Sequence, residues 1–132
     1  MASEIVYEDL YGEVIDRGDL VEIRWFDATS ELDSEGFNAW LAVFAGIVEE
    51  RRRPGVLVDG LAFLMDPAHM DGGWRDANII PRYNAAGVRR FAFVMPAGMP
   101  AIGAAPAPEG PGDFPTGYFG RREDAIAWLA AD

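Results

Sequence analysis

Cysteine and lysine are absent from the 132 residues, and histidine occurs once. Without cysteine the chain has no disulfide, no thiolate zinc site and no thiol nucleophile. Its first ten residues, MASEIVYEDL, lack the basic and apolar regions of a signal peptide. No run approaches the roughly 18 apolar residues that span a bilayer. We therefore expect a cytoplasmic protein that does not enter the membrane.

Basic charge is also scarce, with 11 arginines against 22 acidic residues and a formal net charge of -11. Such a chain repels phosphate backbones, so nucleic-acid binding is not expected unless the arginines cluster. Arginines do occur in runs at 51–53, 89–90 and 121–122. These runs favour solvated helix and strand ends, because arginine complements a helix C-terminus. A local anion-binding patch is the alternative.

Half of the residues are apolar, and the length is that of one domain, so residues 1–132 are expected to form a single domain with a real core. Two short strands are predicted at 5–7 and 14–15, before a clearer strand at 20–26. Its alternating residues are Val21, Ile23 and Trp25 on the apolar face, and Glu22 and Arg24 on the charged face. The alternation predicts a half-buried strand.

A helix of about 19 residues is predicted from Ser34. Ser34 is expected to cap its N-terminus, residues 51–53 suit its C-terminal dipole, and Pro54 ends it. Apolar residues at three- and four-residue spacing form one face of this helix. They are Phe37, Trp40, Leu41, Phe44, Ile47 and Val48.

Two short apolar runs, at 56–58 and 91–95, lack polar alternation. This is typical of strands buried on both faces of a parallel sheet. The helical pattern at 67–86 between them completes a βαβ unit. Pro81 is expected to kink or restart that helix, and Gly87 to end it.

The C-terminal third begins with residues 96–113, which hold five of the nine prolines and predict a long loop or a flap. An edge strand at 116–119 and a helix at 121–130 are expected after it. The predicted fold class is therefore α/β, a single domain with a mixed, partly parallel sheet and packing helices. We find no internal repeat and no domain linker.

The order of these elements, with the run VLVDGLAFLMDPAHM at 56–70, resembles STAS domains, the family of bacterial anti-sigma-factor antagonists and sulfate-transporter tails. Other motifs resemble small bacterial STAS-like or SEC14-like proteins. These are Trp74, Pro81-Arg82, residues 87–94, Tyr118-Phe119 and residues 124–129. In the antagonists, an aspartate after the strand is followed by a phosphorylated serine or threonine, and the added charge releases the partner. The corresponding aspartate here is Asp66, and Pro67 and Ala68 follow it, so the resemblance implies partner binding without the phospho-switch.

The Asp66-Pro67-Ala68-His69 sequence is typical of a helix start. Aspartate caps free N–H groups, proline suits the first helical position, and His69 then lies near the end of the first turn. The functional alternative adds Asp59, which is expected at the carboxyl end of a strand, where ligands of open α/β sheets bind. One histidine and two carboxylates could hold a divalent metal or form an acid–base pair. Trp74 follows two glycines and could roof a pocket nearby.

No second histidine, nucleophile elbow or glycine-rich phosphate loop with lysine accompanies these residues. We therefore predict no catalytic or metal-binding residues and no cofactor, and we treat Asp59, Asp66, His69 and Trp74 as binding candidates. The leading hypothesis is a non-catalytic regulatory module that binds a protein partner or a second copy of itself. The alternative is a carrier of a small apolar molecule or lipid, with a pocket at the strand ends gated by 96–113. An enzyme is the third reading.

Overall fold

The computed structural model describes residues 3–65, 72–95, 107–108 and 114–131. Three strands come first, and helices then separate most of the later strands. In chain order the elements are β1 (Glu4–Glu8), β2 (Gly12–Asp16), β3 (Leu20–Trp25), the 3-10 helix η1 (Asp27–Glu31), α1 (Ser34–Arg51), β4 (Gly55–Asp59), α2 (Gly72–Asn78), α3 (Ile80–Ala86), β5 (Arg90–Val94), β6 (Ala107–Pro108), β7 (Pro115–Phe119) and α4 (Arg122–Ala130).

The described strands form one mixed sheet in the order β1-β2-β3-β4-β5-β7-β6. The pairs β1–β2, β2–β3 and β6–β7 are antiparallel, whereas β3, β4, β5 and β7 run parallel to one another. This confirms the predicted α/β class with a mixed, partly parallel sheet. The ends of β3 and β4 at Trp25 and Asp59 lie on one edge of the sheet, which we call the carboxyl edge.

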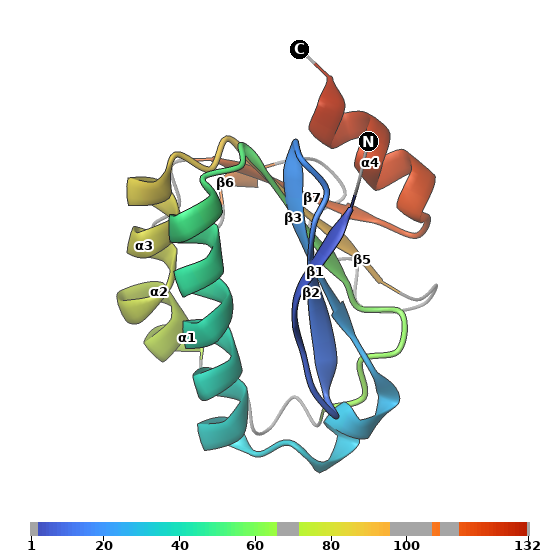
Figure 1. Cartoon of the computed structure of the whole chain (residues 1–132), viewed down its shortest axis with the longest axis vertical. Coiled ribbons are helices and arrows are strands. Elements are labelled where there is room, and N and C mark those ends of the chain that lie inside the picture. Colours follow the sequence, from blue (N-terminus) through green and yellow to red (C-terminus); the bar gives the residue numbers. More distant parts are fainter. Residues whose placement is uncertain (1–2, 66–71, 96–106, 109–113, 132) are drawn as a thin grey trace.

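Helices cover both faces of this sheet (Figure 1). α1, α2 and α3 pack together on one face, and α4 packs on the other against β4, β5 and β7. Because side chains alternate along a strand, each strand contributes to both layers. The α1 side holds the larger core cluster, including Ile23, Phe44 and Tyr83, and the α4 side a smaller one around Leu57 and Ala125.

The helix predicted from Ser34 is confirmed as α1, and its apolar face is buried, with Ile47 partly so. Its cap was predicted one residue too late. The carboxylate of Asp33 accepts a hydrogen bond from the backbone N–H of Gly36 at 2.8 Å, and Ser34 is already helical. Aspartate and serine are equally good caps, so two adjacent candidates cannot be separated by type alone.

The predicted crossover is confirmed for its described part, as two short helices. A break at Ile79 separates α2 from α3, Pro81 lies in the first turn of α3, and Gly87 follows with φ 87°. That left-handed conformation favours glycine. The predicted edge strand at 116–119 is present as β7, but β6 lies outside it, so its edge position was wrong. Asp66, Pro67, Ala68, His69 and most of 96–113 lie outside the described residues.

Candidate functional site

Asp59 is the one predicted site residue that the structure places among other charged groups. It ends β4 as expected and is buried, with 6% of its surface exposed. One carboxylate oxygen accepts a hydrogen bond from the backbone N–H of Leu61 at 3.2 Å. The other accepts one from the guanidinium of Arg122 at 2.9 Å. The first contact shapes the turn after β4, and the second ties β4 to the start of α4.

Asp59 belongs to a group of charges on the α4 face of the sheet, which we call the Glu22 ion cluster. Its members are Glu22, Asp59, Arg17, Arg24 and Arg122. The parallel register of β3 and β4 places Arg24 opposite Asp59, and alternation brings Glu22 to the same face. Arg17 comes from the turn before β3, and Arg122 from the first turn of α4.

Glu22 is the centre of this cluster, and its side chain is completely buried. It accepts hydrogen bonds from the Nε of Arg17 at 2.6 Å and from both terminal nitrogens of Arg122. Arg24 lies 3.7 Å from both Glu22 and Asp59. Burial raises the pKa of Glu22, but the guanidinium groups of Arg122 and Arg17 outweigh it and hold that pKa below its ordinary value.

This arrangement does not suit acid–base chemistry. A general base near neutral pH needs a raised carboxyl pKa and room for a substrate proton, whereas Glu22 has a lowered pKa and no exposed surface. The Glu22 ion cluster instead joins the start of α4 to β3 and β4, because Arg122 donates hydrogen bonds to both Glu22 and Asp59.

Two sequence interpretations are wrong here. Glu22 was expected on the polar face of a half-buried strand, yet β3 is buried on both faces at this residue. Arg122 was expected at a solvated end, yet it bonds to Glu22, 100 residues away along the chain. The sequence did contain a signal for the burial of Glu22. This residue lies between Leu20 and Ile23 in a predicted strand that is followed by a parallel crossover. Such strands are central and covered on both faces.

Trp74, the other predicted site residue that the structure describes, does not join Asp59. Trp74 lies on α2, on the opposite face from the Glu22 ion cluster, and packs half-buried against the larger core. Asp66 and His69 lie outside the described residues, so the structure does not test the alternative of a metal site that combined them with Asp59. Among the residues that are described, no group of carboxylates and imidazoles has an arrangement suited to a metal ion.

A turn that we call the leucine turn, residues 60–65, follows Asp59 at the carboxyl edge. Its backbone is held at both ends. The N–H of Gly60 donates to the carbonyl of Val94 at 2.8 Å, and the N–H of Leu64 donates to the hydroxyl of Thr29 at 2.8 Å. The ring of Phe63 packs against Trp25, with the ring centres 5.3 Å apart. In contrast, Leu61 and Leu64 are 45% and 58% exposed. Sequence reasoning treated these leucines only as part of an apolar stretch.

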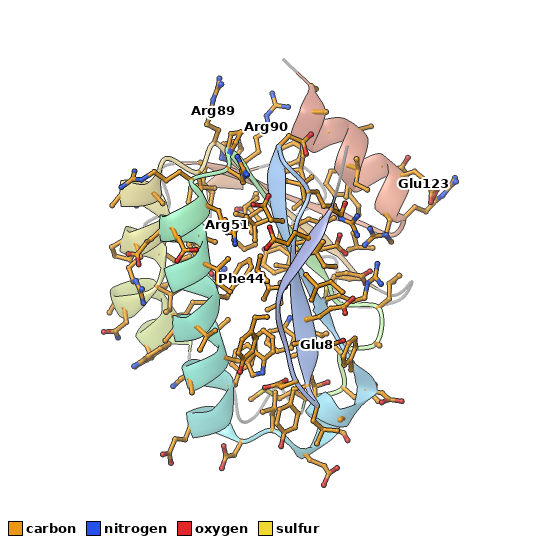
Figure 2. The ribbon with its side chains drawn as sticks, in the orientation of Figure 1. Glu8, Phe44, Arg51, Arg89, Arg90 and Glu123 are labelled. Carbon is orange, nitrogen blue, oxygen red and sulfur yellow. The ribbon has the colours of Figure 1, made fainter. Side chains whose placement is uncertain are left out.

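At the opposite edge of the sheet, two arginines of the run 51–53 pair with an internal carboxylate. Arg53 donates two hydrogen bonds of 3.0 Å to buried Asp16, and Arg51 lies 3.4 Å from it. The hydrogen bonds from Arg53 lower the pKa of Asp16. Arg89 and Arg90 project from this edge (Figure 2), and Arg90 donates a hydrogen bond to the carbonyl of Trp128 at 2.5 Å. Arg52 and Arg89 are exposed, as the interpretation of solvated ends requires, whereas Arg51, Arg53 and Arg90 pair with internal groups, which that interpretation did not include.

The lowered pKa values predict loss of stability in acid. Below the ordinary values of 4.5 for Glu22 and 3.8 for Asp16, the unfolded chain binds protons that the folded chain resists. The free energy of unfolding should therefore fall as the pH drops from about 6 to about 3. Urea titrations at a series of pH values measure it. Glu22→Gln should flatten this dependence; an unchanged slope would mean that Glu22 does not contribute.

In comparisons with known proteins, no family model, no curated protein and no solved structure matches the chain. The resemblance to STAS domains therefore rests on the sequence motifs. Within the described residues, no helix has the length and apolar character needed to cross a bilayer.

Proposed function

We propose that this protein is a non-catalytic interaction module of STAS-like type that binds a protein partner through the leucine turn. The observation that carries the proposal is the exposure of Leu61 and Leu64, at 45% and 58%, on a turn whose backbone is fixed by hydrogen bonds to β5 and η1. Exposed apolar side chains on a rigid backbone lose little conformational entropy on binding. Burial of two leucines is a common source of interface affinity.

The charge around this turn indicates the chemistry of the partner. η1 contacts the leucine turn through Thr29 and carries exposed Asp27 and Glu31, within a chain of net charge -11. Two such surfaces repel each other, whereas a basic surface is attracted. The partner is therefore a different protein that presents apolar side chains flanked by arginine or lysine. A second copy of this chain is the competing occupant.

The sequence that follows the turn supports regulation by some means other than phosphorylation at this position. Residues 67 and 68 are proline and alanine, where the antagonists that this chain resembles have a phosphorylated hydroxyl. Neither side chain accepts a phosphate, so binding at the leucine turn is not controlled at these two positions. Phosphosite mapping of the native protein checks this: a stoichiometric phosphate between residues 60 and 72 would contradict it.

The partner can be captured by a photo-crosslinking residue in place of Leu64, with the same residue in place of Ile5 as the control. Ile5 is 56% exposed but lies on β1, away from the turn. The protein crosslinked from position 64 is then purified and its affinity is measured. The variant Leu61→Ser/Leu64→Ser should bind at least roughly tenfold more weakly, which equals about 1.4 kcal/mol, and Ile5→Ser should bind normally.

The proposal fails if the purified protein binds the double variant as tightly as the wild type. It also fails if position 64 gives no more crosslinking than position 5. Crosslinking of position 64 to another copy of this chain would replace the proposed partner by a homodimer. Both leucines are exposed, so the double variant should keep the thermal stability of the wild type, which separates loss of binding from loss of folding.

A further inference from the structure

A cavity of about 370 Å³ opens between the β1–β2 turn and the N-terminal half of α1. It lies at the carboxyl edge of the sheet, because β1 runs toward that edge and α1 begins there. Its volume is within the range of small-molecule sites. This cavity is distinct from the predicted apolar pocket, since its lining includes neither Asp59 nor Trp74. The inference drawn from it does not depend on the leucine turn.

Aromatic rings and a shared carboxylate form one wall of the cavity. Tyr7, Tyr11 and Trp40 line it, and the rings of Tyr7 and Trp40 meet edge to face with centres 5.1 Å apart. The carboxylate of Asp9 accepts hydrogen bonds from the indole N–H of Trp40 at 3.0 Å and from the Tyr7 hydroxyl at 3.3 Å. It also accepts one from the backbone N–H of Tyr11 at 2.8 Å. All three of these donors are neutral groups rather than cations.

Two further carboxylates complete the lining. Glu31 and Asp33 are both exposed, and none of the described residues that line the cavity is an arginine. Within the described residues, Asp9, Glu31 and Asp33 take part in no salt bridge, although arginines pair with the acidic groups elsewhere, as at Glu22 and Asp16. Within the described residues, this cavity therefore has three acidic side chains in its lining and no cationic side chain paired with them.

The N-terminus of α1 brings a partial positive charge to the same region, which would favour an anion. Asp33 offsets this charge because its carboxylate already accepts the hydrogen bond from Gly36, and Glu35 lies in the same first turn. Three carboxylates around aromatic rings are instead the chemistry that binds alkylammonium and guanidinium groups. We propose that this cavity binds an organic cation, either a free small molecule or an arginine or lysine side chain.

The indole N–H of Trp40 provides a specific reporter, because the chain has only four tryptophans and this N–H is bonded to Asp9. In two-dimensional ¹H–¹⁵N NMR spectra, Trp40→Phe identifies its signal. Tetramethylammonium chloride represents the free cation and a capped arginine amide the side chain, with sodium chloride keeping the ionic strength constant. Either probe should shift the Trp40 signal with a dissociation constant on the order of 1–10 mM, and leave Trp128 unaffected.

The matched variants change charge without changing the fold. Glu31→Gln/Asp33→Asn removes two carboxylates while asparagine preserves the helix cap. Glu50→Gln/Asp124→Asn removes two exposed acids that lie outside the cavity. The first pair should weaken cation binding roughly three- to tenfold, and the second by less than about twofold. Saturation by the arginine amide alone would assign the site to a protein side chain, and saturation by tetramethylammonium to a free ligand.

Several results would overturn the assignment. One is a Trp40 signal that moves with neither cation up to roughly 50 mM. Another is an equal shift with tert-butanol, which has the shape of the ammonium ion but no charge. A shift with sodium sulfate alone would indicate an anion site at the N-terminus of α1. Equal affinities of the two charge variants would show that the carboxylates do not recognise the cation.

Discussion

Replacing Arg122 by methionine is expected to lower the free energy of unfolding by about 3 kcal/mol. The side chain of Glu22 has no exposed surface and would lose its hydrogen bonds to Arg122, and Asp59 would lose its closest cation. Arg17 would remain with Glu22, which is why the expected cost is at the lower end for a buried pair. Urea-induced unfolding at pH 7 measures the change.

Arg121 provides the matched control, because it is the same residue type one position earlier. Its side chain is 72% exposed and, among the described residues, pairs with the exposed Glu123, so Arg121→Met should change the stability by less than about 0.5 kcal/mol. The double variant Glu22→Leu/Arg122→Met should recover part of the loss, because it removes the buried carboxylate that has lost its hydrogen bonds to Arg122. Equal losses of stability in Arg122→Met and Arg121→Met would contradict the stabilising role of the Glu22 ion cluster.

Replacing Phe44 by alanine is expected to cost about 3–5 kcal/mol. Phe44 lies between α1 and the sheet (Figure 2) and is 1% exposed. Its ring meets that of Tyr83 on α3, with the centres 6.2 Å apart. Truncation therefore leaves a cavity where α1, α3 and the sheet meet, and the surrounding rings cannot fill it without leaving their rotamers.

Val43 is the control for this second prediction because it precedes Phe44 on the same helix but is 39% exposed. Val43→Ala should cost less than about 1 kcal/mol. Thermal unfolding followed by circular dichroism compares the two variants. A cost for Phe44→Ala similar to that for Val43→Ala would show that α1 does not pack as described.

The elements with regular apolar spacing could be predicted from the sequence because their periodicity reflects burial. α1 and the strands β4 and β5 were found in this way, with boundaries within a few residues of those observed. The break between α2 and α3 was anticipated from Pro81, whose missing N–H and fixed φ suit a helix start. These features depend on neighbours in the chain, so local patterns are sufficient to reveal them.

The ion cluster could not be predicted because its partners are distant in sequence. Glu22 and Arg122 are 100 residues apart, and no local spacing indicates that they meet. A strand followed by a parallel crossover indicates burial of Glu22, but the sequence does not indicate that α4, from the other end of the chain, packs on that face. Distance along the chain also hid the second contact of Trp40. This residue was predicted as core and is buried, but its indole N–H donates a hydrogen bond to Asp9, 31 residues away, beside a cavity.

We propose that recognition occurs at the leucine turn, whereas the charged groups of the Glu22 ion cluster have a structural role. The most direct measurement compares the affinity of the partner captured from position 64 for two variants, at a temperature where both are folded. Leu61→Ser/Leu64→Ser should bind at least roughly tenfold more weakly than the wild type, and Arg122→Met should bind within about twofold of it. The reverse result, with binding lost in Arg122→Met and kept in Leu61→Ser/Leu64→Ser, would contradict recognition at the leucine turn.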